Sequence, residues 1–129
     1  MTVIAEHALE LLADLGPLVA KRMFGGAGIM LDGMMIAVVF GETIYIKADE
    51  ATEAAFEAAG SSVFTFQMKD GRTGRLRYWR LPEAAQDDPE EAVRWGRLGL
   101  EAALRARAAK APKKGKKARA DIGPGPWDG

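Results

Sequence analysis

The sequence contains no cysteine and one histidine among its 129 residues. Without cysteine there is neither a disulfide nor a thiolate zinc site, and one histidine leaves too few imidazoles for most other transition-metal sites. No apolar run approaches the roughly 20 residues that a membrane-spanning helix needs. The opening residues, MTVIAEHALELL, carry acids where a signal peptide carries basic residues. These absences predict a cytoplasmic protein without metal, cofactor or membrane contact.

The formal net charge is zero, but the two signs are separated along the chain. Residues 1–104 hold 10 Lys and Arg against 16 Asp and Glu, a net charge of −6, whereas residues 105–129 hold 8 against 2, a net charge of +6. Near residue 109 apolar periodicity stops and Lys, Ala, Gly and Pro dominate. That composition buries too little apolar surface to offset its ordering entropy. We expect one folded domain over residues 1–108 and a disordered basic tail over 109–129.

A glycine-rich stretch, MFGGAGIML at residues 23–31, looks like a phosphate-binding loop. A Walker loop needs Lys and then Ser or Thr after its last glycine, but Ile29 follows Gly28. A dinucleotide fingerprint needs a third glycine opening a helix, but Leu31 stands there and an Asp32-Gly33 turn follows. We therefore expect these glycines to let a strand bend, bulge or pass close under another element.

Periodicity and turn signals divide the first half of the domain into five elements. An apolar stripe predicts a helix over residues 2–16, which Gly16 ends. Three strands follow over 21–31, 34–40 and 43–48, and the Asp-Gly and Gly-Glu links between them predict hairpins. A second helix over 49–60 begins at a capping Asp49 and stops at Gly60.

The second half reads as two strands and a long helix. Phe64, Phe66 and Met68 alternate with polar residues, and KDGR then turns the chain into a strand over residues 73–81. The last helix has Asp88 as its cap, Pro89 in its first position and Glu91 to complete a capping box. Its predicted buried stripe is Val93, Gly96, Leu100 and Leu104.

The order α-β-β-β-α-β-β-α with short links favours a two-layer α+β fold, in which helices pack on a mainly antiparallel, five-stranded sheet. An open sheet has two edges. We expect a homodimer formed through an apolar edge strand such as residues 34–40 or its neighbour.

Several residue sets that could carry chemistry have simpler explanations. His7 has no Ser or Cys partner at a recognisable spacing. The acids at 87, 88, 90 and 91 suit the first turn of a helix, where the dipole favours them. Met30, Met34 and Met35 are either core filler or a soft contact surface. No catalytic, metal or cofactor residue is therefore assigned.

Two basic segments are candidates for contact with nucleic acid or a partner. In RTGRLRYWRL, alternation places Arg75, Arg77 and Trp79 on one face, and arginine with an aromatic ring can bind phosphate and stack on a base. The alternative is that Trp79 packs under a helix and the arginines pair with the domain's own acids. The second segment is the tail, whose closely spaced cations suit electrostatic binding to DNA, RNA or an acidic protein. The alternative is that the tail only makes the protein more soluble. The tail cations are Lys110, Lys113, Lys114, Lys116, Lys117 and Arg119.

Four segments together resemble a known family. KRMFGGAGIMLDGMMIAVV, ETIYIKAD, FEAAGSSVFTF and YWRLPEAAQDDPEEAVRWGRLGLEAA are similar to the N-terminal domain of the TfoX/Sxy family of bacterial competence regulators, over about residues 3–108. The resemblance implies a secretion-chaperone-like α+β fold without assigned catalytic residues. It also implies a link to DNA-uptake genes, although a basic tail stands here where family members carry a second, helical domain.

From the residues and the resemblance we expect a non-enzymatic regulatory module that binds another macromolecule. The expected partner is a protein, with nucleic acid as a further partner of the tail. The alternative is a small-molecule sensor or enzyme with a pocket between sheet and helices.

Overall fold

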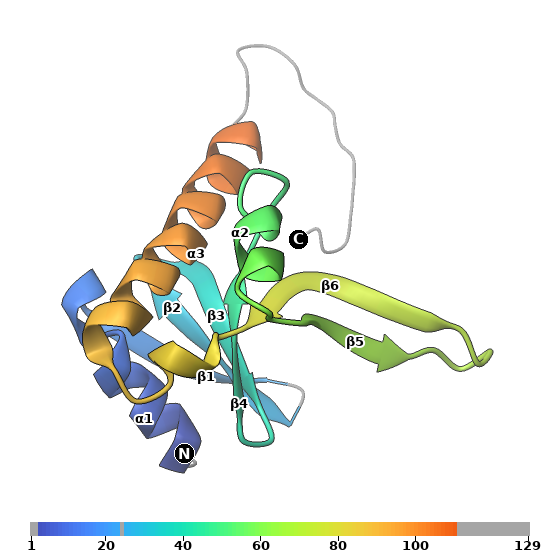
Figure 1. Cartoon of the computed structure of the whole chain (residues 1–129), viewed down its shortest axis with the longest axis horizontal. Coiled ribbons are helices and arrows are strands. Elements are labelled where there is room, and N and C mark those ends of the chain that lie inside the picture. The colour runs from blue at the N-terminus through green and yellow to red at the C-terminus, as the bar shows by residue number, and fades with distance from the viewer. Residues whose placement is uncertain (1–2, 24, 111–129) are drawn as a thin grey trace.

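The computed structural model describes residues 3–23 and 25–110, which form an α+β fold (Figure 1). Within these residues six strands make one antiparallel sheet in the order β1-β2-β3-β4-β6-β5. Two 3₁₀ helices, Ala13–Leu15 and Glu83–Ala85, join larger elements. The larger elements are α1 (Val3–Leu11), β1 (Leu18–Met23), β2 (Gly26–Leu31), β3 (Met34–Phe40), β4 (Thr43–Lys47), α2 (Glu53–Ala58), β5 (Val63–Gln67), β6 (Thr73–Arg80) and α3 (Pro89–Lys110).

The prediction of five strands is wrong, because the segment expected as one strand over 21–31 is two. β1 pairs antiparallel with β2, and the chain reverses where Gly25 takes a positive φ of 79°. The prediction that the glycines permit close approach is confirmed. A Cβ at Gly26 would collide with the backbone oxygen of Val39, and one at Gly28 would lie 2.9 Å from the sulfur of Met23.

The predicted hairpin between β2 and β3 is confirmed. Asp32 and Gly33 have φ of 56° and 79°, the positive values that a two-residue type I′ turn requires. The expectation that Met34–Phe40 or its neighbour lies at a sheet edge is wrong. β3 pairs with β2 on one side and β4 on the other, so the edges are β1 and β5.

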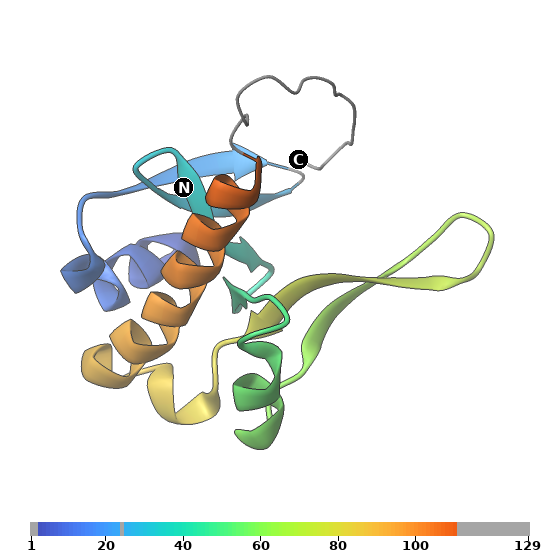
Figure 2. The ribbon, with the colours of Figure 1, turned by 90° about the horizontal axis from the view of Figure 1, so that it is seen from above.

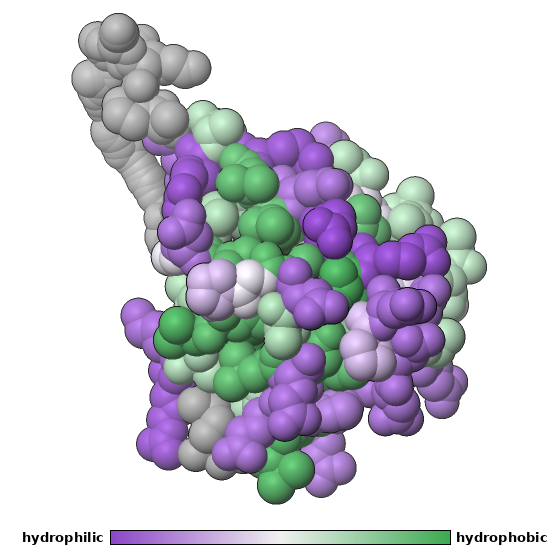
Figure 3. Space-filling model, turned by 90° about the vertical axis from the view of Figure 1, so that its left-hand side faces the viewer, coloured by the Kyte–Doolittle hydropathy of each residue, from purple (hydrophilic) through white to green (hydrophobic). Residues whose placement is uncertain are grey.

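All three α-helices lie on one face of the sheet. α1 contacts β1 to β4, α3 packs across β3 and β4, and α2 lies against β6. The largest fully buried side chains lie between these layers, and Figure 3 shows further apolar side chains gathered on the side of the molecule where α1 and α3 lie. No helix in the described ranges is long and apolar enough to span a membrane. The fully buried side chains are Leu12, Ile29, Ile36, Ile46, Phe56 and Leu81.

The buried stripe predicted for α3 is largely wrong. Leu104 is 46% exposed, and Val93 and Leu100 are only half-buried. A Cβ at Gly99 would lie 2.7 Å from the backbone oxygen of Ile36, so the helix rests directly on the sheet backbone and small residues must face it. The buried residues of α3 are Ala92, Gly96, Gly99, Ala102 and Ala103.

The predicted start of α3 is confirmed in part. The carboxylate of Asp88 accepts a hydrogen bond from the backbone N–H of Glu90 at 3.1 Å, as an N-cap does. Among the described residues, no hydrogen bond joins the Glu91 carboxylate to the backbone N–H of Asp88, so the predicted capping box is not formed. It forms an ion pair with Arg94 at 2.9 Å.

Candidate interaction site on a projecting hairpin

The β5–β6 hairpin extends away from the rest of the domain (Figures 1 and 2). Its strands pair through Phe64 with Leu76 and Phe66 with Gly74. At its tip Gly71 takes a φ of 89°, and Met68 donates its backbone N–H to the oxygen of Arg72 at 2.8 Å. Because it stands clear of the helices, both of its sides are accessible to solvent.

The hairpin has one apolar and one polar side. Directly opposed residues of an antiparallel pair point the same way, so Phe64, Phe66 and Leu76 share a side. Phe66 and Leu76 are each 39% exposed, and Phe66 lies over Gly74, where a Cβ would collide with its ring. The other side carries Thr65, Gln67, Thr73 and Arg75.

The apolar side continues onto the sheet face that carries no helix. The ring of Phe64 lies 5.1 Å from that of Phe40 and 4.9 Å from that of Tyr45, which it meets edge-on. Tyr45 precedes Ile46, whose side chain faces α3 near Gly99, and successive strand residues point to opposite faces. We call Phe40, Tyr45, Phe64, Phe66 and Leu76 the aromatic strip.

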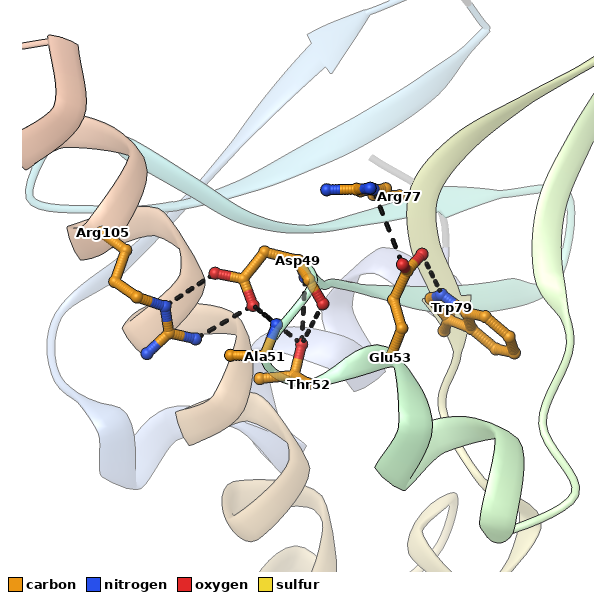
Figure 4. A network of polar contacts seen from close by, with 7 residues as sticks. All are labelled: Asp49, Ala51, Thr52, Glu53, Arg77, Trp79 and Arg105. Atoms are coloured by element: carbon orange, nitrogen blue, oxygen red, sulfur yellow. Dashed lines mark hydrogen bonds and ion pairs between the residues drawn. The ribbon is translucent and has the colours of Figure 1, made fainter.

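Of the three candidate residues on β6, two have partners within the domain (Figure 4). Trp79 is 8% exposed, and its indole N–H donates to the carboxylate of Glu53 at 3.0 Å while its ring stacks on Phe56. Arg77 pairs with the same carboxylate at 3.6 Å. These contacts match the alternative interpretation, in which Trp79 lies under a helix. Arg75 is exposed, and contact of these residues with nucleic acid stays a prediction.

Comparison with protein families matches residues 10–103 to the TfoX N-terminal domain. The chain belongs to the TfoX N-terminal domain family. It is 29% identical over 96 residues to Protein Sxy of Escherichia coli (strain K12), and the match covers 74% of this chain and 46% of Sxy. The chain thus spans less than half the length of this relative. The family resemblance inferred from the four sequence segments is confirmed.

A second polar cluster ties the loop before α2 to α3 in this TfoX N-terminal domain (Figure 4). Arg105 donates to both carboxylate oxygens of Asp49, at 2.7 and 3.0 Å. These hydrogen bonds lower the pKa of the Asp49 carboxyl and raise that of the Arg105 guanidinium. Asp49 also accepts from the backbone N–H of Ala51 at 3.1 Å, so it caps the turn before α2 rather than the helix itself, which begins at Glu53.

The remaining candidates lie outside the hairpin. The His7 ring donates through Nε2 to the backbone oxygen of Gln86 at 2.9 Å. Met34 is buried, and Met30 and Met35 are half-buried. Lys110 lies in the last turn of α3. Lys113, Lys114, Lys116, Lys117 and Arg119 lie outside the described residues.

Sequence reasoning identified the alternation of Phe64 and Phe66 but not their exposure. Alternation shows that one side of a strand is apolar, and most such sides in a domain this small are buried. The missing information was that no helix among the described residues covers the apolar side of the hairpin, although α2 ends only a few residues before it. In this TfoX N-terminal domain α2 lies against the base of β6, where the ring of its Phe56 stacks on that of Trp79.

Proposed function

We propose that this chain is a non-enzymatic regulatory module that acts by binding a protein partner through the aromatic strip and the free edge of β5. One observation carries the proposal. The projecting hairpin keeps an apolar side, with Phe66 and Leu76 each 39% exposed, where no described helix covers it. Membership of the TfoX N-terminal domain family supports the regulatory part, including a role in competence, although the match covers 46% of Sxy.

The edge of β5 supports a partner strand better than the edge of β1 does. An edge strand offers unpaired backbone N–H and C=O groups, and charged side chains commonly protect it from pairing. β1 carries exposed Lys21 and Arg22. β5, of sequence VFTFQ, carries no charge. A partner could therefore extend the sheet at β5 and cover the adjacent apolar side chains.

Site-specific photo-crosslinking in the cells that produce the full chain tests this proposal. A photoreactive phenylalanine analogue replaces Phe66 in one variant and Gln67 in the matched control. These neighbours point to opposite sides of the same strand. We expect a discrete protein adduct from position 66 that survives nuclease treatment, and little or none from position 67.

Three results would overturn the proposal. Equal adducts from both positions would mean that side-specific contact is absent. An adduct that nuclease removes would assign the hairpin to nucleic acid. An adduct formed only with a second copy of the chain would replace the proposed partner by self-association.

A further inference from the structure

A cleft beside α3 differs in its chemistry from the apolar side of the projecting hairpin. It lies between the C-terminal half of α3 and the β2–β3 hairpin, and its volume is about 690 Å³. Ligand pockets commonly measure about 300 to 1,000 Å³, so the cleft can hold a small molecule. Lys47 of β4 and Tyr78 of β6 complete its lining.

Three cations line this cleft. Lys47 comes from β4, and Arg107 and Lys110 come from the last turns of α3. None of the described residues that line it is an acid. The nearest hairpin acid, Asp32, offers Arg107 its backbone oxygen at 2.8 Å rather than its carboxylate. The cleft is therefore positively charged, although residues 1–104 carry a net charge of −6.

Lys47 is held where its charge is poorly compensated. Its ammonium nitrogen lies 5.4 Å from the centre of the Tyr78 ring. Burial lowers its pKa most, the charge of Lys110 lowers it further, and Asp49 opposes this. Asp49 is itself bound through both oxygens by Arg105, which does not line the cleft (Figure 4). A bound anion would relieve the repulsion between Lys47 and Lys110.

The rest of the lining is apolar. Met30, Met34 and Met35 come from the β2–β3 hairpin, and Ala103 and Ala106 come from α3. Methionine side chains are flexible and polarisable, so they adapt to apolar groups of varied shape. The hydroxyl of Tyr78 is neutral at physiological pH, as that of an ordinary tyrosine is, and burial raises its pKa further, to about 12, so it can donate a hydrogen bond.

We infer that this cleft binds a small amphipathic oxyanion, whose carboxylate or phosphate head contacts Lys47, Arg107 and Lys110 and whose apolar body lies against the three methionines. Charge complementarity favours this occupant over the chain's own tail, because residues 111–129 hold five basic and two acidic residues. The methionines distinguish it from a nucleic-acid surface, on which a basic groove follows the backbone and aromatic side chains stack on the bases. The inference is independent of the hairpin proposed above to bind protein.

Binding of decanoate below its micellar concentration tests the inference on the full chain. Isothermal titration compares decanoate with acetate and inorganic phosphate, which have only the head, and with decanol, which has only the body. We expect decanoate to bind and the other three to bind weakly or not at all. Lys47→Gln should weaken decanoate binding about tenfold or more, because a charge-assisted hydrogen bond is lost. Arg97→Gln, an exposed cation of α3 outside the cleft, should change nothing.

A second measurement uses the unaltered protein, so it tests the inference even if the Lys47→Gln variant does not fold. The chain has six methionines, three of which line the cleft. In a ¹³C-methyl NMR titration with decanoate, the methyl signals of Met30, Met34 and Met35 should shift, and that of Met68 at the hairpin tip should not. Equal binding of decanol and decanoate, unchanged affinity in a folded Lys47→Gln variant, or shifts confined to other methionines would overturn the inference. Displacement of decanoate by a short DNA duplex would assign the cleft to nucleic acid instead.

Discussion

Gly96 and Gly99 lie one turn apart on α3, but they face different kinds of neighbour. A Cβ at Gly99 would lie 2.7 Å from the backbone oxygen of Ile36 and 2.8 Å from a methyl group of Ile46. Backbone atoms of a sheet cannot move aside cheaply. We expect Gly99→Ala to destabilise the domain by about 1 to 3 kcal/mol, although alanine favours the helix. The midpoint of urea unfolding measures this loss.

Gly96→Ala is the matched control. Its Cβ would lie 2.8 Å from side-chain methyl groups of Leu12 and Leu15, which can rotate away. The gain in helix propensity, about 1 kcal/mol, offsets most of that adjustment, so the variant should stay within about 1 kcal/mol of the parent protein. Equal losses from both substitutions would show that α3 does not rest on the sheet backbone at Gly99.

The Asp49–Arg105 pair gives stability a defined pH dependence. Arg105 lowers the pKa of Asp49 below its ordinary value of 3.8 in the folded protein. A group with a lowered folded pKa stabilises the protein above its unfolded pKa, and the contribution is lost as the pH falls through the folded pKa. Asp49→Asn should therefore lower the melting temperature at neutral pH, and the difference from the parent protein should vanish well below pH 3.8.

Asp14→Asn is the control for this prediction. It removes one exposed carboxyl from the 3₁₀ helix that follows α1. Asparagine at 49 keeps an oxygen that can accept the hydrogen bond from Ala51, so the comparison isolates the charge. A difference between Asp49→Asn and the parent protein that persists unchanged in acid would contradict the assignment of the pair.

At the scale of the element, substitution on the hairpin should cost much less stability than substitution in the core. Phe56 is fully buried between Trp79 and Trp95, so Phe56→Ala should cost roughly 3 to 5 kcal/mol. Phe66 lies on the projecting hairpin and is 39% exposed, so Phe66→Ser should cost less than about 1 kcal/mol. Denaturant unfolding measures both. A large loss for Phe66→Ser would mean that the hairpin is part of the folding core and not a free surface.

Turns and helix ends were predictable because their chemistry is local. Asp32-Gly33, Gly60 and Asp88 each need a particular backbone angle or hydrogen bond that a few neighbouring residues supply. The reversal at Gly25 was missed because three close glycines fit a bend as well as a turn. The positive φ of Gly25 makes the chain reverse there, and no neighbouring residue in the sequence indicates that angle.

Packing between elements was less predictable because it depends on distant residues. The apolar period of α3 pointed to Leu104, but the close approach at Gly99 selects small residues and turns Leu104 outward. The cleft cations show the same limit, since Lys47 and Arg107 are 60 residues apart and only the fold brings them to one site. The exposure of Phe66 likewise follows from the absence of a covering helix among the described elements.

At the scale of the molecule, charge is divided among three regions. Residues 1–104 are acidic, the cleft beside α3 is basic, and residues 111–129 add five basic residues to two acidic ones. An acidic body repels a polyanion over a Debye length of roughly 8 to 10 Å, so the folded part should oppose binding to nucleic acid. The predicted homodimer stays a prediction, and the edges open to it are β1 and β5.

The chain beyond α3 should therefore carry whatever affinity the protein has for DNA. If its five basic residues each neutralise a phosphate, the logarithm of the binding constant should fall against that of salt concentration with a slope of about −4.5 on duplex DNA. Phosphate contacts carry no sequence information, so different duplexes should bind alike. Ending the chain after Lys110, where α3 ends, should abolish binding and leave the melting temperature nearly unchanged.

Replacing the lysines beyond α3, without shortening the chain, distinguishes the effect of their charge from the effect of the chain's length. A full-length variant with Gln at positions 113, 114, 116 and 117 keeps one basic residue beyond α3, so its salt slope should fall to about −1 with nearly all affinity lost. Fluorescence anisotropy of a labelled duplex over a salt series measures both variants. Full affinity in the chain that ends at Lys110 would move the contact to the folded part, where Arg75 and Arg77 are the exposed members of the β6 candidates. Binding that is insensitive to salt would instead rule out phosphate neutralisation as its cause, because released counterions must appear in the slope.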